Sequence, residues 1–338
     1  MIIEMLSRIT TAKLLLMVLF PGAAIHAPGQ VISGSVIDSE TGGAVGFATV
    51  YLSGTTVGTV ACENGKFELD LSRYPSLPVT ISSMGYTSVT LDEFSTDIAL
   101  KISLSPLTYD LAEISISARS LKRERRSNLR IFREQFLGRT IYARRCAILN
   151  EEDITFNYGS DSDTLKAFGL KPLQVRNEAL GYIITFYLEN FEFCRINCNA
   201  LYNGTFTFME DKSDESSGSL EEGRRNIVYL GSAMHFFRSL WADDLKSQGF
   251  SVEDQQGNPL SYEDFVIIDE GHKYLLDQGG LRVYYDGFGV GTRSFLRPLK
   301  NRVLFDESGY FDPVSIMLMG EMGKQRVSDM LPLDFVPQ

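Results

Sequence analysis

The chain has 338 residues, of which 44% are hydrophobic, so wholesale disorder is excluded and there is room for two domains. Its formal net charge is −11 at pH 7. Because so acidic a protein repels phosphate backbones, we expect no nucleic-acid partner.

The N-terminal segment, residues 1–27, predicts a signal peptide. Arg8 and Lys13 give it a basic start, and Leu14–Phe20 is a short apolar run. This run is far below the roughly 20 residues that span a bilayer, so we expect no transmembrane anchor in the mature chain. The small residues ending at Ala24 favour cleavage there. We therefore expect export to the periplasm, the outer membrane or the cell surface.

Short strand-like segments with Gly or Asn turns between them follow the signal. Apolar and polar residues alternate in these segments, as they do in half-buried strands. The segments are Ile32–Asp38, Ala48–Leu52, Gly58–Leu69, Val79–Tyr86, Asp97–Leu104 and Leu111–Ala118. The pattern predicts a seven-strand-type antiparallel β-sandwich over residues 28–118.

One turn within this region can be predicted in detail. Asn64 and Gly65 stand between two strand-like runs, which indicates a two-residue hairpin with positive φ at both positions. Phe67 follows two residues later and is expected to point into the sandwich.

Four motifs in this region resemble one known family. They are a G-x-V-x-D strand at Gly34–Asp38, a strand ending before a G-T turn at Leu52–Thr55, an E-x-x-x-F turn at Glu63–Phe67, and Gly85–Tyr86. The order resembles the carboxypeptidase-like regulatory domain, a transthyretin-like sandwich related to carbohydrate-binding folds. The resemblance implies an accessory module and not a catalytic one.

A basic segment, Arg119–Arg126, follows the sandwich. It lacks periodic apolar residues, so we interpret residues 119–127 as a solvated linker. Ser127 suits the N-cap of a helix that ends before Gly138. The apolar residues at helical spacing are Leu129, Phe132, Phe136 and Leu137.

Residues 128–338 predict a β-rich α+β domain. The expected strands are Ile154–Tyr158, Leu173–Arg176, Tyr182–Leu188, Thr205–Met209, Phe265–Ile268, Leu281–Tyr285 and Arg302–Phe305. Between them we expect an acidic, serine-rich loop at Asp211–Glu222 and a helix at Met234–Leu245, with Ser232 as its N-cap and Gly249 after it.

This second region resembles a domain of unknown function in exported bacterial proteins that carry the same sandwich. The resemblance rests on Arg133-x-x-Phe136-Leu-Gly138, Asn177-x-x-Leu180-Gly-Tyr182, Tyr229-Leu-Gly-Ser232-x-x-His235-Phe236 and the ending Arg326-x-x-Asp329-Met-Leu-Pro-Leu333. It implies an envelope location and no catalytic residue.

The sequence lacks the motifs of a metal enzyme. A zinc carboxypeptidase needs a His-x-x-Glu pair, but Arg238 stands three residues after His235 and Leu275 three after His272. We therefore reject that activity and expect no metal, no cofactor and no catalytic residue. His235 lies among apolar residues and is interpreted as a packed histidine that bonds a backbone carbonyl; His272 is placed in a turn.

The four cysteines allow one local disulfide. Cys194 and Cys198 flank a short turn between two strand-like runs, and a disulfide there is as plausible as two free thiols. Cys146 has an apolar flank that favours a buried thiol.

Aromatic residues on the strands are expected first to pack in the core, and binding a ligand is the best functional use for them. Tyr182, Phe186 and Tyr187, or Tyr284 and Tyr285, could stack against sugars or an extended peptide. They favour a non-catalytic protein that binds carbohydrate or an envelope protein. The alternative is a glycosidase-like hydrolase with a carboxylate pair, drawn from Glu189, Glu192, Asp243, Asp244 and Asp286.

Overall fold

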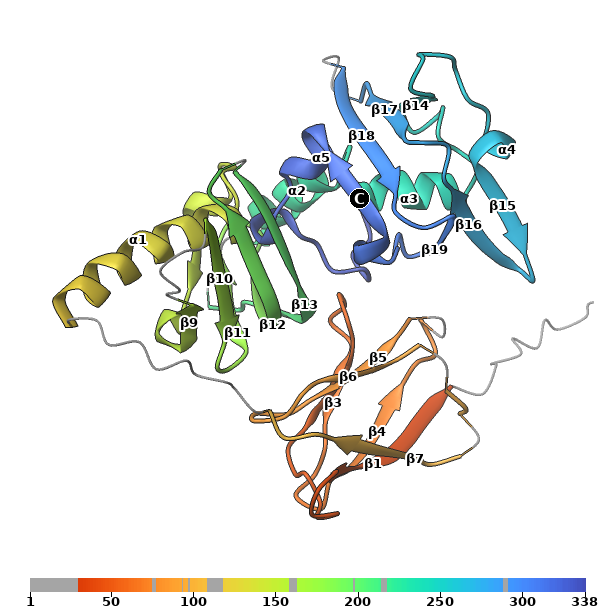
Figure 1. Ribbon diagram of the computed structural model, residues 1–338. Coiled ribbons are helices and arrows are strands. Elements are labelled where there is room, and N and C mark those ends of the chain that lie inside the picture. The colour runs from red at the N-terminus through yellow and green to blue at the C-terminus, as the bar shows by residue number, and fades with distance from the viewer. Residues whose placement is uncertain are drawn as a thin grey trace, which may run out of the picture.

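The structure is a computed structural model, and it describes most of the chain after residue 29 (Figure 1). The described ranges are 30–74, 77–92, 94–96, 98–107, 118–157, 163–196, 198–213, 218–287 and 291–338. The predicted signal peptide and most of the predicted strand Leu111–Ala118 lie outside them. Among the described helices, none combines the length and apolarity needed to cross a membrane.

The N-terminal part is the predicted sandwich. Its strands are β1 Val31–Asp38, β2 Thr49–Leu52, β3 Gly58–Val60, β4 Lys66–Asp70, β5 Val79–Ser82, β6 Val89–Leu91 and β7 Leu100–Leu104. They form two sheets, in the orders β4-β1-β7 and β3-β2-β5-β6. Every pairing is antiparallel except that of β1 with β7, which is parallel. Val36, Val50, Ile81 and Leu104 are fully buried in the core between them.

The Gly65 turn differs from the predicted hairpin. Gly65 has φ +76°, but Asn64 is not left-handed, and β3 and β4 belong to different sheets. The Gly65 N–H donates to Cys62 O and the Cys62 N–H to Lys66 O, a three-residue loop that ends in a left-handed glycine. A Cβ at position 65 would lie 2.5 Å from Val36 O, so only glycine fits. Phe67 is buried, as predicted.

Helix α1, Ala118–Phe136, shows that the linker interpretation of residues 119–127 was wrong (Figure 1). The helix begins before the basic segment, and Ser127 lies inside it. Arg125 explains part of this, because its guanidinium donates to the carbonyls of Ile154 and Glu151 at 2.8 Å each. Phe132 and Phe136 are fully buried on the predicted face, and Gly138, with φ +100°, follows the end of the helix.

Helix α1 packs on a six-stranded sheet with a long central hairpin. The strands are β8 Cys146–Ile148, β9 Ile154–Asn157, β10 Thr164–Gly169, β11 Leu173–Asn177, β12 Tyr182–Cys194 and β13 Asn199–Glu210. They follow the order β8-β11-β12-β10-β9, and β13 pairs along the free side of β12. The 3-10 turns Ala143–Arg145 and Glu151–Asp153 lie at its edge.

Two helices then lead to the last part of the chain. Helix α2, Gly218–Tyr229, begins inside the segment predicted as an acidic loop, so that prediction was wrong from residue 218 onward. Arg225 anchors it by donating to Leu180 O at 2.7 Å. Helix α3, Ala233–Trp241, has the predicted N-cap, since Ser232 Oγ accepts from the His235 N–H at 3.0 Å.

The last part forms a second core around α3, separate from the core under α1. Its strands are β14 Phe250–Glu253, β15 Val266–Asp269, β16 His272–Leu276, β17 Leu281–Tyr285, β18 Thr292–Pro298, β19 Arg302–Phe305 and β20 Ile316–Met319. They build one sheet in the order β14-β17-β18-β20 and another in the order β15-β16-β19. Short helices complete it: α4 Tyr262–Phe265, α5 Gly320–Lys324 and the 3-10 turn Pro313–Ser315. The last 3-10 turn, Val327–Asp329, returns to the core under α1, where Val327 is buried.

The sandwich docks on the α1-covered sheet through the loop between β2 and β3. The Gly54 N–H donates to Phe206 O at 2.8 Å and the Phe208 N–H donates to Thr55 O at 3.0 Å, so the loop pairs with the edge of β13. On the other side of the loop, the Leu333 N–H donates to Gly54 O at 2.7 Å. The loop therefore lies between β13 and the C-terminal segment, residues 331–335, which we call the tail.

A left-handed glycine makes this docking testable. Gly54 has φ +81°, and a Cβ there would lie 3.2 Å from Leu333 Cδ1. Gly42 has φ +70° with nothing within 4 Å, so Gly42→Val adds only the backbone strain, roughly 1–2 kcal/mol. We expect Gly54→Val, and not Gly42→Val, to raise amide hydrogen exchange at Phe208 and Leu333 in the full chain. Equal exchange in the two variants would contradict the docking.

Candidate ligand-binding face

Four of the five aromatic residues predicted to bind a ligand are covered by other parts of the chain. Phe186 and Tyr285 are buried in the two C-terminal cores. The guanidinium of Arg225 lies 4.0 Å from the centroid of the Tyr182 ring and covers it. Together these contacts rule out the exposed platform predicted around Tyr182 and Phe186.

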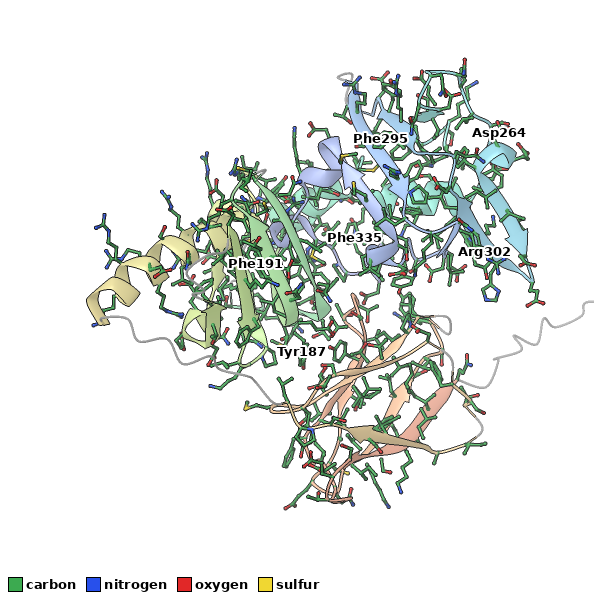
Figure 2. The ribbon with its side chains drawn as sticks, in the orientation of Figure 1. Tyr187, Phe191, Asp264, Phe295, Arg302 and Phe335 are labelled. Atoms are coloured by element: carbon green, nitrogen blue, oxygen red, sulfur yellow. The ribbon has the colours of Figure 1, made fainter. Side chains whose placement is uncertain are left out.

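Tyr187 points to the opposite face of its sheet, where the sandwich lies (Figure 2). Its ring stacks on Tyr51, with centroids 5.4 Å apart. Tyr51 is fully buried, and its hydroxyl bonds Thr205 Oγ1 at 2.6 Å; burial raises the pKa of this phenol. Tyr187 therefore serves the contact between the sandwich and the sheet, with one ring face stacked on Tyr51.

Tyr284 is the exception, because it is half-buried on the side of its sheet that faces away from the core. Leu281, Val283 and Tyr285 point into the core on one side of β17, so Arg282 and Tyr284 point to the other. The same alternation on β18 buries Ser294 and Leu296 and turns three residues outward, Arg293, Phe295 and Arg297.

We call this outer surface of the β14-β17-β18-β20 sheet the arginine–aromatic face. It consists of Arg282, Tyr284, Arg293, Phe295, Arg297, Met317 and Met319. Helix α3 packs on the opposite side of the sheet (Figures 1 and 2). On the outer side Arg293 and Arg297 are exposed, and Arg282, Tyr284 and Phe295 are half-buried. Met317 and Met319 are 44% and 42% exposed, which is high for methionine on a sheet.

Cations and aromatic rings alternate across the strands of this face. Arg282 stands directly opposite Phe295, and Tyr284 stands opposite Arg293. Such cross-strand neighbours have Cβ atoms about 4.5–5.5 Å apart. Each pair therefore places one guanidinium and one ring side by side, and the second pair lies two residues further along the sheet. The guanidinium of Arg282 also donates to Gln255 O at 2.6 Å.

The charges of the face are only weakly neutralised. Glu253 stands opposite Arg282 on β14 and is the acidic side chain of that row. Within the described ranges, neither Arg293 nor Arg297 has a carboxylate at ion-pair distance. By contrast, Arg302 on the neighbouring sheet is paired with Asp269 at 2.8 Å and stacks on Tyr274. The face therefore carries uncompensated positive charge in a chain of net charge −11.

The face also contains a hollow of about 500 Å³. Its lining includes both members of one cation–ring pair, Arg282 and Phe295, together with Arg293, Gln255, Ser294 and Gly320. Sequence analysis missed these residues, although Arg-Ser-Phe-Leu-Arg at 293–297 repeats cations and a ring at alternate positions of one strand. That alternation is the signal that points to a polar–aromatic outer face.

A second hollow, of about 550 Å³, lies where the tail meets β13 and α2. Its charged lining is mixed, with Lys212 and Arg225 beside Glu210, Glu222 and Asp334. Asp334 already accepts from the Thr56 N–H at 3.0 Å and from its hydroxyl, and Glu222 accepts from the Gln338 side chain. Because these side chains already have partners, the second hollow belongs to the contact between the sandwich, the tail and α2.

His235 is packed, as predicted, but with different partners. It is 2% exposed, and its ring lies 4.8 Å from that of Phe250. Nδ1 accepts the Gly231 N–H at 3.1 Å, so Nε2 carries the proton and donates to Gln248 Oε1 at 3.2 Å. The predicted backbone carbonyl is thus replaced by a backbone N–H. Burial lowers the pKa of this imidazole.

The carboxylates considered for a hydrolase are spread over three elements. Glu189 and Glu192 both lie on β12. Glu189 accepts a hydrogen bond from Asn203, and Glu192 forms an ion pair with Lys166 of β10 at 2.8 Å. Hydrogen bonds from Ser247 and Gln248 lower the pKa of Asp244, which follows α3 together with Asp243. Asp286 follows β17 and is exposed. The structure gives none of them a described partner carboxylate.

Burial raises the pKa of two other carboxylates, Asp306 and Asp329. Asp306 accepts the backbone N–H groups of Ser308 and Tyr310, and Asp329 accepts the Arg326 N–H and the Ser328 hydroxyl. Both therefore close local turns. In the part of the chain that is described, no group of three or more His, Cys, Asp or Glu side chains is placed to hold a metal ion.

The cysteines are free thiols, and no disulfide joins Cys194 to Cys198. Cys194 ends β12 opposite Asn199, and Cys198 is left-handed, with φ +56°, in the turn between them. Cys146 packs against the core as predicted, and burial raises its pKa to about 12. The turn predicted around His272 is Glu270–Gly271, both left-handed, and His272 itself begins β16 opposite Asp269, so its placement in the turn was wrong.

The comparison with known families supports the resemblance seen in the sequence. Residues 32–116 match the CarboxypepD_reg-like domain. The N-terminal sandwich is a CarboxypepD_reg-like domain. This is a non-catalytic domain type, and the match ends before α1, so it leaves the arginine–aromatic face unassigned. No curated protein matches the chain.

The histidine environment predicts a pH dependence of stability. The pKa of His235 is lowered in the folded state, so the unfolded chain binds this proton more readily. The contribution of neutral His235 to the free energy of unfolding is complete above about pH 6.5. It is lost as the pH falls through the pKa of the folded state. We expect His235→Asn, which keeps an acceptor for the Gly231 N–H, to flatten the pH dependence of the denaturation midpoint below about pH 6.5.

Asp306 and Asp329 have raised pKa values, so they change stability with pH in the opposite direction to His235. Their contribution to the free energy of unfolding is lost as the pH rises. Because both carboxylates are present in each protein, the difference between wild type and variant isolates His235. Parallel curves for the two proteins would show that the imidazole does not titrate with folding.

Proposed function

We propose that this protein is an exported, non-catalytic binding or structural component of the bacterial cell envelope that recognises carbohydrate or a protein partner. The observation that carries the proposal is the arginine–aromatic face. It holds two cation–ring pairs on a hollowed sheet surface whose rings are half-exposed, while most other aromatic side chains named above are covered. Exposed rings and arginines on an open surface are typical of recognition sites.

The accessory nature of the N-terminal domain supports a role without catalysis. A CarboxypepD_reg-like domain is a non-catalytic domain type, and here it is docked through the β2–β3 loop by backbone hydrogen bonds. The candidate carboxylates fall in three places, on β12, after α3 and after β17, and His235 is packed between rings with both nitrogens bonded. These features favour a scaffold that supports a binding surface, and they do not favour an active site.

Export is the first part of the proposal to test. A basic start followed by a short apolar run, as in residues 1–27, is the pattern that directs secretion and is then removed. We expect cell fractionation to recover the protein from the envelope, with a mature N-terminus near residue 25. Recovery from the cytoplasm with Met1 intact would contradict this part.

Binding is the second part. We expect the exported protein to retain specific envelope glycans or proteins on an array and in cross-linking, and to lose them in the variant Arg293→Gln/Arg297→Gln. The same preparation should release no sugar from those glycans. Hydrolysis that survives the double variant but is abolished by changing one of the carboxylates named above would instead identify a hydrolase.

A further inference from the structure

We propose that the arginine–aromatic face binds an acidic polysaccharide, a chain of carboxylate-bearing sugars. This inference rests on the proposed binding function and names its ligand class. Each cation–ring pair matches one such sugar, since the guanidinium can bond the carboxylate while the ring packs on the apolar face of the sugar. The pairs Arg282–Phe295 and Tyr284–Arg293 repeat this combination on neighbouring rows.

The charge of the face favours an anionic ligand. Arg282, Arg293 and Arg297 all project from this side of the sheet, and Glu253 is the acidic side chain in line with them. The rest of the chain is acidic, but screening limits its repulsion to about 8–10 Å at physiological salt, so the local arginines decide what binds. Arginine suits this role because its planar fork bonds a carboxylate with two N–H groups.

The shape and polarity of the face favour a glycan over an acidic peptide. A peptide that binds a sheet usually pairs with the backbone of an edge strand. Here the arginines and both rings come from β17 and β18, the two inner strands of the sheet, so these residues offer side chains and not a free strand edge. Exposed rings between guanidinium groups suit a ligand that presents apolar ring faces and carboxylates in turn.

The experiment measures binding of the full exported chain to polygalacturonate, with dextran as the neutral glycan and poly-L-glutamate as the acidic peptide. We expect polygalacturonate to bind, to weaken as salt is raised, and to exceed both other probes. Arg293→Gln/Arg297→Gln and Tyr284→Leu should each weaken it by about tenfold or more, the loss expected for a strong contact.

The neighbouring sheet supplies matched controls. Arg302→Gln removes a guanidinium that pairs with Asp269, and Tyr274→Leu removes the ring on which this guanidinium stacks; both should leave polygalacturonate binding unchanged. Thermal unfolding of every variant checks that the fold is kept. Equal losses in the control variants would overturn the assignment to this face.

The remaining outcomes separate this inference from the proposed function. Equal binding of poly-L-glutamate through the same arginines would overturn the glycan and indicate an acidic protein partner. No binding of polygalacturonate, with a neutral glycan or an envelope protein retained on the array, would overturn the inference and leave the proposed function standing. Failure of every glycan and envelope protein to bind would overturn both.

Discussion

The arrangement of the whole molecule depends on a few peptide groups in the loop between β2 and β3. Gly54 and Thr55 bond to the edge of β13 on one side, and Gly54 bonds to Leu333 of the tail on the other. An edge strand exposes unpaired N–H and C=O groups, and here a loop from the sandwich satisfies those of Phe206 and Phe208. The same Gly-Thr turn that marks the family in the sequence is thus the element that attaches the domain.

Much of the fold could be predicted because a strand or helix with one buried face carries apolar residues at a regular spacing. The two-sheet sandwich is confirmed, apart from the parallel pairing of β1 with β7 and the predicted strand Leu111–Ala118, most of which lies outside the described residues. All seven strands predicted after it are confirmed, with Phe265 ending α4 instead of starting β15. The errors fall where distant contacts decide the structure. The basic start of α1 is fixed by carbonyls of the turn at residues 151–153, and α2 begins in a serine-rich segment but is held by Arg225 through Leu180 O. Neither partner is visible in the local sequence.

The candidate site was predictable only in part, for a similar reason. Alternation shows which strand residues share a face, but not which face another domain covers. Tyr187 and Tyr284 look alike in the sequence, yet the first is stacked on Tyr51 and the second is half-buried on the outer side of its sheet. The arginines opposite these rings are set by the register of β17 with β18, which no local motif specifies.

The tail has a thermodynamic consequence. Leu333 packs against the sandwich core, Phe335 belongs to the core under α1, and Arg238 of α3 donates to the carbonyl oxygens of both, at 3.0 and 2.9 Å. Three cores therefore share one short segment, and melting any of them removes a contact that the others use. Calorimetry of such a chain gives transitions that merge, because the parts unfold cooperatively despite their separate interiors. Domain boundaries drawn on the sequence therefore do not define independent units of unfolding in this protein.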